Sequence, residues 1–241
     1  MPNSPLQVRG LSINWDKISH DSYLRGIDAI GSLDSLDFHA PITFFVGENG
    51  SGKSTLLEAI AVAAGFNPEG GTKNYRFSTR DSHSELCGAL RLIRGTSGIR
   101  WGYFLRAESF YNVATAEEEY ARLGGTPHQY HLRSHGESFL AIAQDYFKGG
   151  GLYLLDEPEA ALSPRRQLTL MLEIIRCAKQ HAQFIIVTHS PILLAIPEAE
   201  ILSFDNGSIH TVDYEDTDSF IVTEMFIRDR RLVLKHLLED E

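Results

Sequence analysis

A glycine-rich run near the first quarter of the chain carries backbone and side chains suited to holding a phosphate. It reads Gly47-Glu48-Asn49-Gly50-Ser51-Gly52-Lys53-Ser54-Thr55. Glycines let the backbone curl so that successive N–H groups face one anion, and a helix that starts directly after them adds its positive end. The spacing fits G-x-x-x-x-G-K-[ST], which predicts that Lys53 reaches the β- and γ-phosphates of a nucleotide. The Ser54 hydroxyl is then expected to bind Mg²⁺, and Thr55 to assist at the α-phosphate.

A pair of acids follows an apolar run 103 residues after Lys53. The segment reads Gly151-Leu152-Tyr153-Leu154-Leu155-Asp156-Glu157-Pro158. A buried strand delivers a carboxylate at its carboxyl end, where open α/β sheets bind their ligands. Asp156 is expected to hold Mg²⁺, directly or through water. Glu157 is expected to polarise a water molecule for attack on the γ-phosphate.

A third apolar run ends in a histidine. Phe184 to Val187 is followed by Thr188, His189 and Ser190. A lone histidine at a strand end is more often structural than functional. After the two upstream motifs, however, His189 is the residue we expect to donate a hydrogen bond to the γ-phosphate.

Alternating strand and helix patterns must position these groups. We expect strands over Leu6–Asn14, Ile42–Val46, Leu152–Leu155, Phe184–Val187 and Ile201–Phe204. We expect helices over Thr55–Ala64, over Glu137–Phe147, from the Ser163-Pro164 start to about His181, and in the tail from Asp218.

Two further segments carry turn signals between predicted strands. Glu85–Arg94 and Ile99–Arg106 look like two strands joined by a GTSG turn, and Asn206-Gly207 is a hairpin signal. The pattern predicts a layered α/β domain with a mostly parallel central sheet, an N-terminal antiparallel β part and a C-terminal helical tail. We place the domain at residues 1–212 and the helical appendage at 213–241.

Composition limits the classes of protein that the chain can represent. It has 241 residues, 43% hydrophobic, and a net charge of −10. That balance excludes a simple polybasic nucleic-acid binder. Two distant cysteines, no signal pattern and no apolar run of about 20 residues favour a cytoplasmic protein without membrane insertion. Charge is uneven: residues 73–106 carry seven bases against two acids, and residues 213–241 carry nine acids against four bases.

With these motifs in this order, the chain resembles ABC-type P-loop ATPases. The family's signature precedes the acidic strand, and here Arg133-Ser134-His135-Gly136-Glu137 stands 22 residues before Asp156. The resemblance implies that Ser134 and Gly136 bind the γ-phosphate held by an opposite subunit, in a head-to-tail homodimer with two ATP molecules between its subunits. The family's Q-loop glutamine has no counterpart. Glu108 is the nearest candidate for its place beside Mg²⁺, and Arg106 beside it is a candidate phosphate contact.

The pattern LDFHAPITFFVGENGSGKSTLLEAIA, followed by FLRAESF and SHGES, looks closest to compact bacterial predicted ATPases. These are similar to the heads of SMC and recombination-repair ATPases but lack a coiled coil. The resemblance implies ATP and Mg²⁺ as ligands and ATP hydrolysis as the activity. Two alternatives stay open at this point: a nucleotide-binding subunit of a transporter, and an ATP-gated clamp on DNA or a protein partner, with residues 73–106 as its contact surface.

Overall fold

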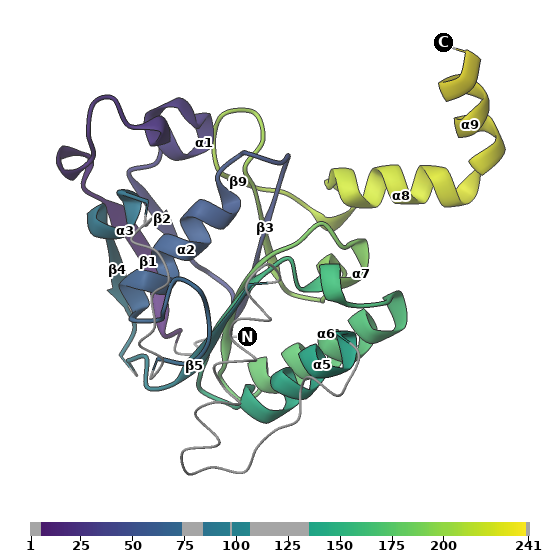
Figure 1. The fold of residues 1–241 in the computed structure, drawn as a ribbon. Helices are drawn as coiled ribbons and strands as arrows, with labels where there is room; N and C mark the ends of the chain where they lie inside the picture. Colours follow the sequence, from purple (N-terminus) through teal and green to yellow (C-terminus); the bar gives the residue numbers. More distant parts are fainter. Residues whose placement is uncertain (1–5, 74–83, 97, 107–134, 240–241) are drawn as a thin grey trace.

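The chain forms a large, mostly parallel β-sheet with helices on both faces and a small antiparallel sheet beside it (Figure 1). The structure is a computed structural model, and it describes residues 6–73, 84–96, 98–106 and 135–239. The strands of the large sheet are, from one edge to the other, β5 (Gly102–Arg106), β6 (Leu152–Asp156), β7 (Gln183–Val187), β3 (Ile42–Val46), β8 (Glu200–Ser203) and β9 (His210–Thr211). The first five are parallel, and β9 is antiparallel to β8.

The central strands β3, β6 and β7 are buried along their whole length. In β3, Phe45 contributes to one hydrophobic core, while Ile42, Phe44 and Val46 contribute to the other. Alternate side chains of a strand point to opposite faces, so a strand covered on both sides must be apolar throughout. That is why these strands read as continuous apolar runs in the sequence.

Because of the register of the parallel strands, polar residues lie together at the carboxyl ends of these strands. Arg106 at the end of β5 lies beside Asp156 at the end of β6, which in turn lies beside Val187 at the end of β7. On the other side of β7, Val46 at the end of β3 pairs with Ser203 of β8. The loop that follows β3 therefore begins at the same edge as the acids after β6 and His189 after β7.

One hydrophobic core lies between the two sheets, around helix α2 (Lys53–Ala64). The small sheet has the order β2-β1-β4, with β2 at Ser35–Asp37, β1 at Val8–Ile13 and β4 at Leu90–Arg94. Four short helices complete this side: η1 (Trp15–Lys17), η2 (Tyr23–Gly26), α1 (Asp28–Gly31) and α3 (Leu86–Ala89). Side chains from α2, β1 and β4 fill the space, which confirms the expected antiparallel N-terminal part.

The second core covers the opposite face of the large sheet. Its helices are α5 (His135–Tyr146), α6 (Pro164–Ala178) and α7 (Pro191–Leu194), with η4 (Pro158–Ala161) between β6 and α6. At its centre, the rings of Phe147 and Tyr153 lie 4.7 Å apart and those of Tyr153 and Phe184 lie 4.9 Å apart. Ser163 occupies the N-cap position of α6, as expected, but its side chain makes no capping hydrogen bond.

The C-terminal helices leave the body of the molecule (Figure 1). After η5 (Tyr214–Asp216), α8 spans Asp218–Arg228 and α9 spans Arg230–Glu239, which confirms the predicted helical tail. The hydroxyl oxygen of Thr217 accepts a hydrogen bond from the amide of Phe220 and so caps α8. Neither helix has a buried residue. The division of the chain at residue 212 stays a prediction.

The expected hairpin between residues 85–94 and 99–106 is wrong. Strand β4 pairs with β1 in the small sheet, whereas β5 pairs with β6 in the large one. Leu86–Ala89 is helical rather than extended. Tyr103, Phe104 and Leu105 are all buried in β5, as a strand covered on both faces requires, whereas β4 is largely exposed. The Asn206-Gly207 turn does connect an antiparallel pair, β8 and β9.

Among the residues that the structure describes, no helix combines the length and the apolar character needed to cross a membrane.

Candidate functional site

The glycine-rich loop joins the carboxyl end of β3 to the start of α2, as its sequence predicts. Gly52 has φ of +96° and directly precedes the helix. A Cβ at this position would lie 2.5 Å from the side chain of Ile30, so both the backbone conformation and the packing require glycine. The first residues of α2, Lys53 to Thr55, therefore present their backbone N–H groups at the loop, where an anion is favoured.

Asp205, which follows β8, holds the start of this loop. Its Oδ1 accepts a hydrogen bond of 2.9 Å from the amide of Glu48. Gly47 has φ of +134°, and a Cβ there would lie 2.9 Å from the carboxylate of Asp205. Ser203 donates its hydroxyl to Oδ2 of Asp205 at 3.1 Å. The loop is thus anchored by a residue that lies 157 positions away in the chain.

Lys53 lies inside the loop. Its ammonium donates to the carbonyl oxygens of Gly47 at 2.6 Å and Glu48 at 2.7 Å. Burial lowers the pKa of Lys53, and the nearby carboxylates of Asp205, Glu157, Asp156 and Glu48 oppose that shift. The same acids thus favour the charged form of the Lys53 side chain.

The two expected Mg²⁺ ligands contact one another. The Ser54 hydroxyl donates to Oδ1 of Asp156 at 2.8 Å. A hydroxyl and a carboxylate are hard oxygen ligands, and Mg²⁺ in nucleotide sites commonly takes one or two such groups and completes its octahedron with phosphate oxygens and water. Within the described residues, no three His, Cys, Asp or Glu side chains are grouped as a self-sufficient metal site. The pair fits an ion that arrives with a nucleotide.

Arg106 lies on the other side of Asp156. Its Nε is 3.7 Å from Oδ2 of Asp156, and one of its terminal nitrogens donates to the carboxylate of Glu58 in α2 at 2.8 Å. Only about a fifth or less of each of these three side chains is exposed. Arg106, proposed from the sequence as a phosphate contact, therefore links the acidic strand to the helix of the phosphate loop.

Glu157 directly follows the acidic strand, in the turn to η4. Its φ is +49°, a left-handed conformation that few residues other than glycine adopt. The amide of Glu157 donates to the carbonyl of Val187 at 3.0 Å, which fixes the turn to β7. Its carboxylate is among the charges that raise the pKa of Lys53, so the two side chains belong to the same site.

His189 is held through its backbone by an acid that the sequence reasoning missed. The amide of His189 donates to Oε1 of Glu159 at 2.6 Å. Burial raises the pKa of Glu159, and the hydrogen bond from His189 opposes that shift. The His189 side chain itself is exposed.

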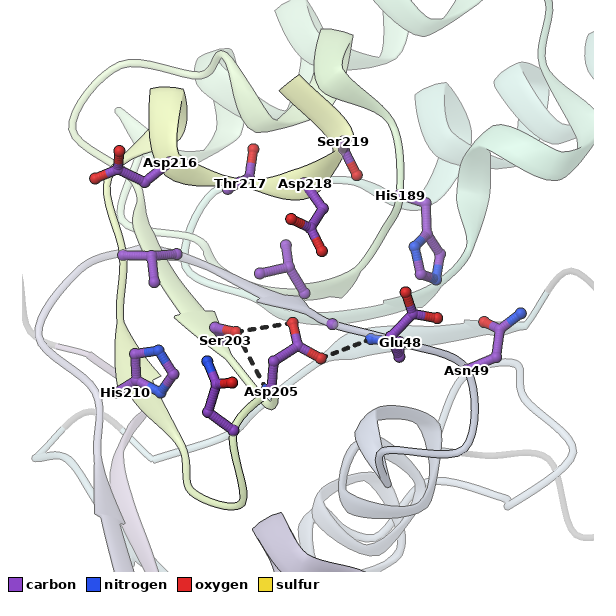
Figure 2. Close-up of a pocket in the computed structure, with 14 residues that line it drawn as sticks. Glu48, Asn49, His189, Ser203, Asp205, His210, Asp216, Thr217, Asp218 and Ser219 are labelled. Carbon is purple, nitrogen blue, oxygen red and sulfur yellow. Dashed lines mark hydrogen bonds between the residues drawn. The ribbon is translucent and has the colours of Figure 1, made fainter. Parts of the chain in front are cut away.

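A pocket of about 640 Å³ lies in front of the loop (Figure 2). Glu48, Asn49 and His189 line it on one side, and Asp205 and the β8–β9 hairpin line another. Its rim is formed by Asp216 at the end of η5, by the N-cap Thr217, and by the first two residues of α8, Asp218 and Ser219 (Figure 2). The structure thus places His189 in the same pocket as Glu48 and Asn49 of the loop, and adds the base of the helical tail to that pocket. The expected contact of His189 with a γ-phosphate stays a prediction.

Gly136 is buried in the first turn of α5. A Cβ there would lie 2.7 Å from the carbonyl of Ala161 and 2.7 Å from the guanidinium of Arg166. Arg166 also binds Glu137 at 3.0 Å. The start of α5 therefore packs on the turn that follows Glu157. Ser134 and Glu108, the other residues taken from the family resemblance, lie outside the described residues.

The three residues that sequence reasoning missed all hold another part of the site in place through a hydrogen bond. Glu159 holds His189, Asp205 holds the loop, and Glu58 holds Arg106. Glu159 stands two residues after Glu157 and Asp205 directly follows a predicted strand, so position offered a signal for both. Glu58 offered none, because its partner is 48 residues away.

Comparisons with known proteins agree with this geometry. A family model described as an AAA domain matches residues 23–110, and another, described as an AAA domain, putative AbiEii toxin of a type IV toxin–antitoxin system, matches residues 138–195. The macrolide export ATP-binding/permease protein MacB of Salmonella typhimurium is 29% identical over 217 residues, covering 78% of this chain and 33% of MacB. The chain therefore spans about a third of the length of these curated relatives.

Two solved structures show similarity at low identity. The SMC head domain from Thermotoga maritima is 17% identical, with a TM-score of 0.48, and the match covers 86% of this chain and all of that one. An ATP-binding cassette of an ABC transporter is also 17% identical, with a TM-score of 0.39, and covers 73% of this chain and 81% of that one.

The loop, the acidic strand and the matches to AAA-domain models that contain them identify the chain as a P-loop protein. Both matched models describe AAA domains and the curated relatives are ATP-binding proteins, so the chain is similar to the ABC/AAA class of ATPases.

Proposed function

We propose that the chain binds ATP with Mg²⁺ at the loop Gly47–Thr55 and hydrolyses it. The observation that carries this proposal is the hydrogen bond between Ser54 and Asp156, with the Lys53 ammonium held inside the same loop. A phosphate bound at the start of α2 would meet the N–H groups of the loop and the cation of Lys53. Mg²⁺ held by Ser54 and Asp156 would neutralise charge on the phosphate oxygens.

The roles of the remaining residues follow from their positions. Glu157 follows Asp156 directly, and in the proposal its carboxylate accepts a proton from an attacking water. His189 is exposed on the pocket wall, and its backbone is fixed by Glu159. In the proposal it donates to the γ-phosphate. Glu108 remains the candidate for a further contact beside Mg²⁺.

The proposal includes an ATP-driven homodimer in the cytoplasm. In the ABC pattern, Ser134 and Gly136 of one subunit complete the phosphate site of the other. Helix α5 begins at His135, directly after Ser134, so the N-terminal end of this helix is suited to an anion. The packing of Gly136 on the turn after Glu157 supports a coupling between this helix start and the hydrolytic residues.

The experiment that tests the proposal compares two variants with the parent chain. Lys53→Ala should abolish ATP binding in calorimetry, because the phosphates lose their cation in the loop. Glu157→Gln should keep binding but slow phosphate release by about 10²–10⁴-fold, the usual contribution of a positioned base. Lys179→Ala, on the exposed end of α6, is the control for a lost lysine. ATP binding by Lys53→Ala at parental affinity would contradict the assignment of the loop.

A DNA-binding clamp is a second candidate, favoured by the basic stretch. Of its described bases, Lys73 donates to the carbonyl of Ile99 and Arg106 belongs to the site, whereas Arg91, Arg94 and Arg100 are exposed. Reversing these three charges to Glu should remove any DNA affinity and its salt dependence while ATP binding continues. If the ATP-trapped Glu157→Gln chain binds no DNA at low salt, a protein partner replaces DNA in this candidate.

The similarity to MacB favours a third possibility, in which this chain serves a transporter as its nucleotide-binding part. Co-purification of a membrane-embedded partner with the Glu157→Gln chain in ATP would support it.

A further inference from the structure

The two C-terminal helices expose an unusual amount of apolar surface. Of the fourteen large hydrophobic side chains exposed among the described residues, nine belong to α8 and α9, which we call the tail. They are Ile221, Val222, Met225, Phe226 and Ile227 in α8, and Leu232, Leu234, Leu237 and Leu238 in α9. Their exposed fractions run from 41% to 76%. Single exposed apolar residues are normal, but a contiguous group of this kind marks an interaction surface.

The tail also lacks the support that short helices need. α8 has 11 residues and α9 has 10, and isolated helices below about 12–15 residues are marginal in water. Among the described residues, the tail is tied to the body at the beginning of α8, where the ring of Phe220 lies 4.8 Å from that of Tyr214 and the hydroxyl of Tyr214 donates to the carbonyl of Pro191. In the part of the chain that the structure describes, nine apolar side chains of the tail stay exposed, and a partner surface would cover them.

The charge order of α9 indicates what that surface is. Arg230 and Arg231 stand in its first turn, and Glu239 ends it, followed in the sequence by two more acids. This order is unfavourable with the helix dipole, which prefers acids at the start and bases at the end. The pair between Lys235 and Glu239, at 3.8 Å, has the less favourable order of the two i,i+4 arrangements, and both side chains are mostly exposed.

An antiparallel copy of the same helix removes this conflict. When two α9 helices lie antiparallel, the basic start of each one faces the acidic end of the other. Leu234, Leu237 and Leu238 are spaced i, i+3 and i+4, so they lie on one face and can pack between the charged ends. A two-fold axis produces both contacts from one surface patch, as symmetric dimers require.

We infer that the tail is a dimerisation element, and that its partner is the tail of a second copy of this chain, with the two α9 helices antiparallel. The nine exposed apolar side chains of α8 and α9 supply the apolar surface that such an interface would bury. The inference does not depend on the proposed ATP chemistry, because none of its residues belongs to the phosphate loop.

The first test is the mass of the full chain in solution without nucleotide. Sedimentation equilibrium at micromolar concentration should give a dimer, and Lys53→Ala, which cannot form an ATP-driven dimer, should give the same dimer. Replacing Leu234 and Leu238 with Ser should leave a folded monomer, because both side chains are exposed in the single copy. A monomeric parent chain overturns the inference.

The second test swaps charges and reports the orientation of the helices. Variant A carries Arg230→Glu and Arg231→Glu, and variant B carries Glu239→Arg. Each alone brings like charges together across the interface, so its dimer dissociation constant should rise about 10²-fold. Variant A has acidic residues at both ends of α9, and variant B has basic residues at both ends. Mixed in equal amounts, they should form an A–B heterodimer in which each end of one helix faces an opposite charge on the other.

The control for the charge change in variant A is Arg165→Glu with Lys179→Glu, two exposed bases of the body that should leave the dimer intact. A dimer unaffected by variants A and B overturns the inference, and so does failure of the mixture to recover it. A tail that binds another protein while the chain stays monomeric also overturns it.

Discussion

The hydroxyl of Ser54 donates a 2.8 Å hydrogen bond to Oδ1 of Asp156, which stands 102 positions later in the chain. Ser54 lies in the first turn of α2, and Asp156 is the last residue of β6. The contact joins the phosphate loop to the acidic strand, and it makes the two oxygens that would hold Mg²⁺ neighbours.

Removing this hydroxyl should weaken the response to Mg²⁺. Ser54→Ala removes one oxygen ligand, so the Mg²⁺ concentration for half-maximal ATPase activity should rise by roughly tenfold or more. Ser54→Thr keeps the hydroxyl and should restore most of the response. Titrating Mg²⁺ at fixed ATP measures the effect. An Ala variant with the parental Mg²⁺ midpoint would show that Ser54 is not a ligand.

Losing the Arg106 guanidinium should change Mg²⁺ binding at Asp156 more than losing the Glu58 carboxylate does. Arg106→Gln leaves two partly buried carboxylates without this cation, so we expect a loss of about 1–3 kcal/mol of stability and a shifted Mg²⁺ midpoint. Glu58→Gln keeps Arg106 beside Asp156 and is the matched control, with a parental Mg²⁺ midpoint. Equal shifts in the two variants would mean that Arg106 acts only on the packing of α2.

The charge of Asp205 should set the alkaline limit of nucleotide binding. Burial lowers the pKa of Lys53, and Asp205 is the largest influence that raises it. Asp205→Asn keeps an oxygen for the Glu48 amide but loses the charge, so the pKa of Lys53 should fall further. ATP affinity, measured by calorimetry from pH 6 to 10, should then begin to decline at a lower pH. Ser203→Ala removes only the hydroxyl bound to Asp205, so the pH at which ATP affinity begins to decline should stay at the parental value.

Glu159 should make the stability of the fold depend on pH. Burial raises the pKa of Glu159 above its value of 4.5 in the unfolded chain, so the native state binds the proton more tightly. Its favourable contribution is full below pH 4.5 and is lost as the pH rises through the raised pKa. Thermal unfolding of Glu159→Gln, compared with the parent chain from pH 4 to 8, should show the variant gaining relative stability over that range. A constant difference would refute this.

The signature should act between subunits. Ser134→Arg should leave the ATP affinity of the monomer nearly unchanged but block ATP-driven association and hydrolysis. Mixed with Lys53→Ala, it should recover some activity, because one of the two shared sites then has an intact loop and an intact signature. Normal hydrolysis by Ser134→Arg alone would remove the ATP-sandwich model.

Much of the site could be read from local sequence. A short apolar run that favours a buried strand precedes each of three features: the loop at 47–55, the acids at 156 and 157, and the histidine at 189. Parallel strands place their carboxyl ends at the same side of the sheet. Alternation of such runs with helices also fixed the fold class. These features depend on neighbours within a few residues, which a sequence displays directly.

Tertiary structure decided what depends on distant partners. Residues 85–106 were expected to form a hairpin, but burial on both faces draws β5 into the large sheet, while β4 joins β1. Asp205 holds the loop from 157 positions away. Glu159 holds His189 across 30 positions, and Glu58 holds Arg106 across 48. No spacing rule predicts such contacts, because they arise only when the strands take their order in the sheet. The sequence identified the groups that could bind a nucleotide, whereas the packing of the strands and helices determined which other residues hold those groups in place.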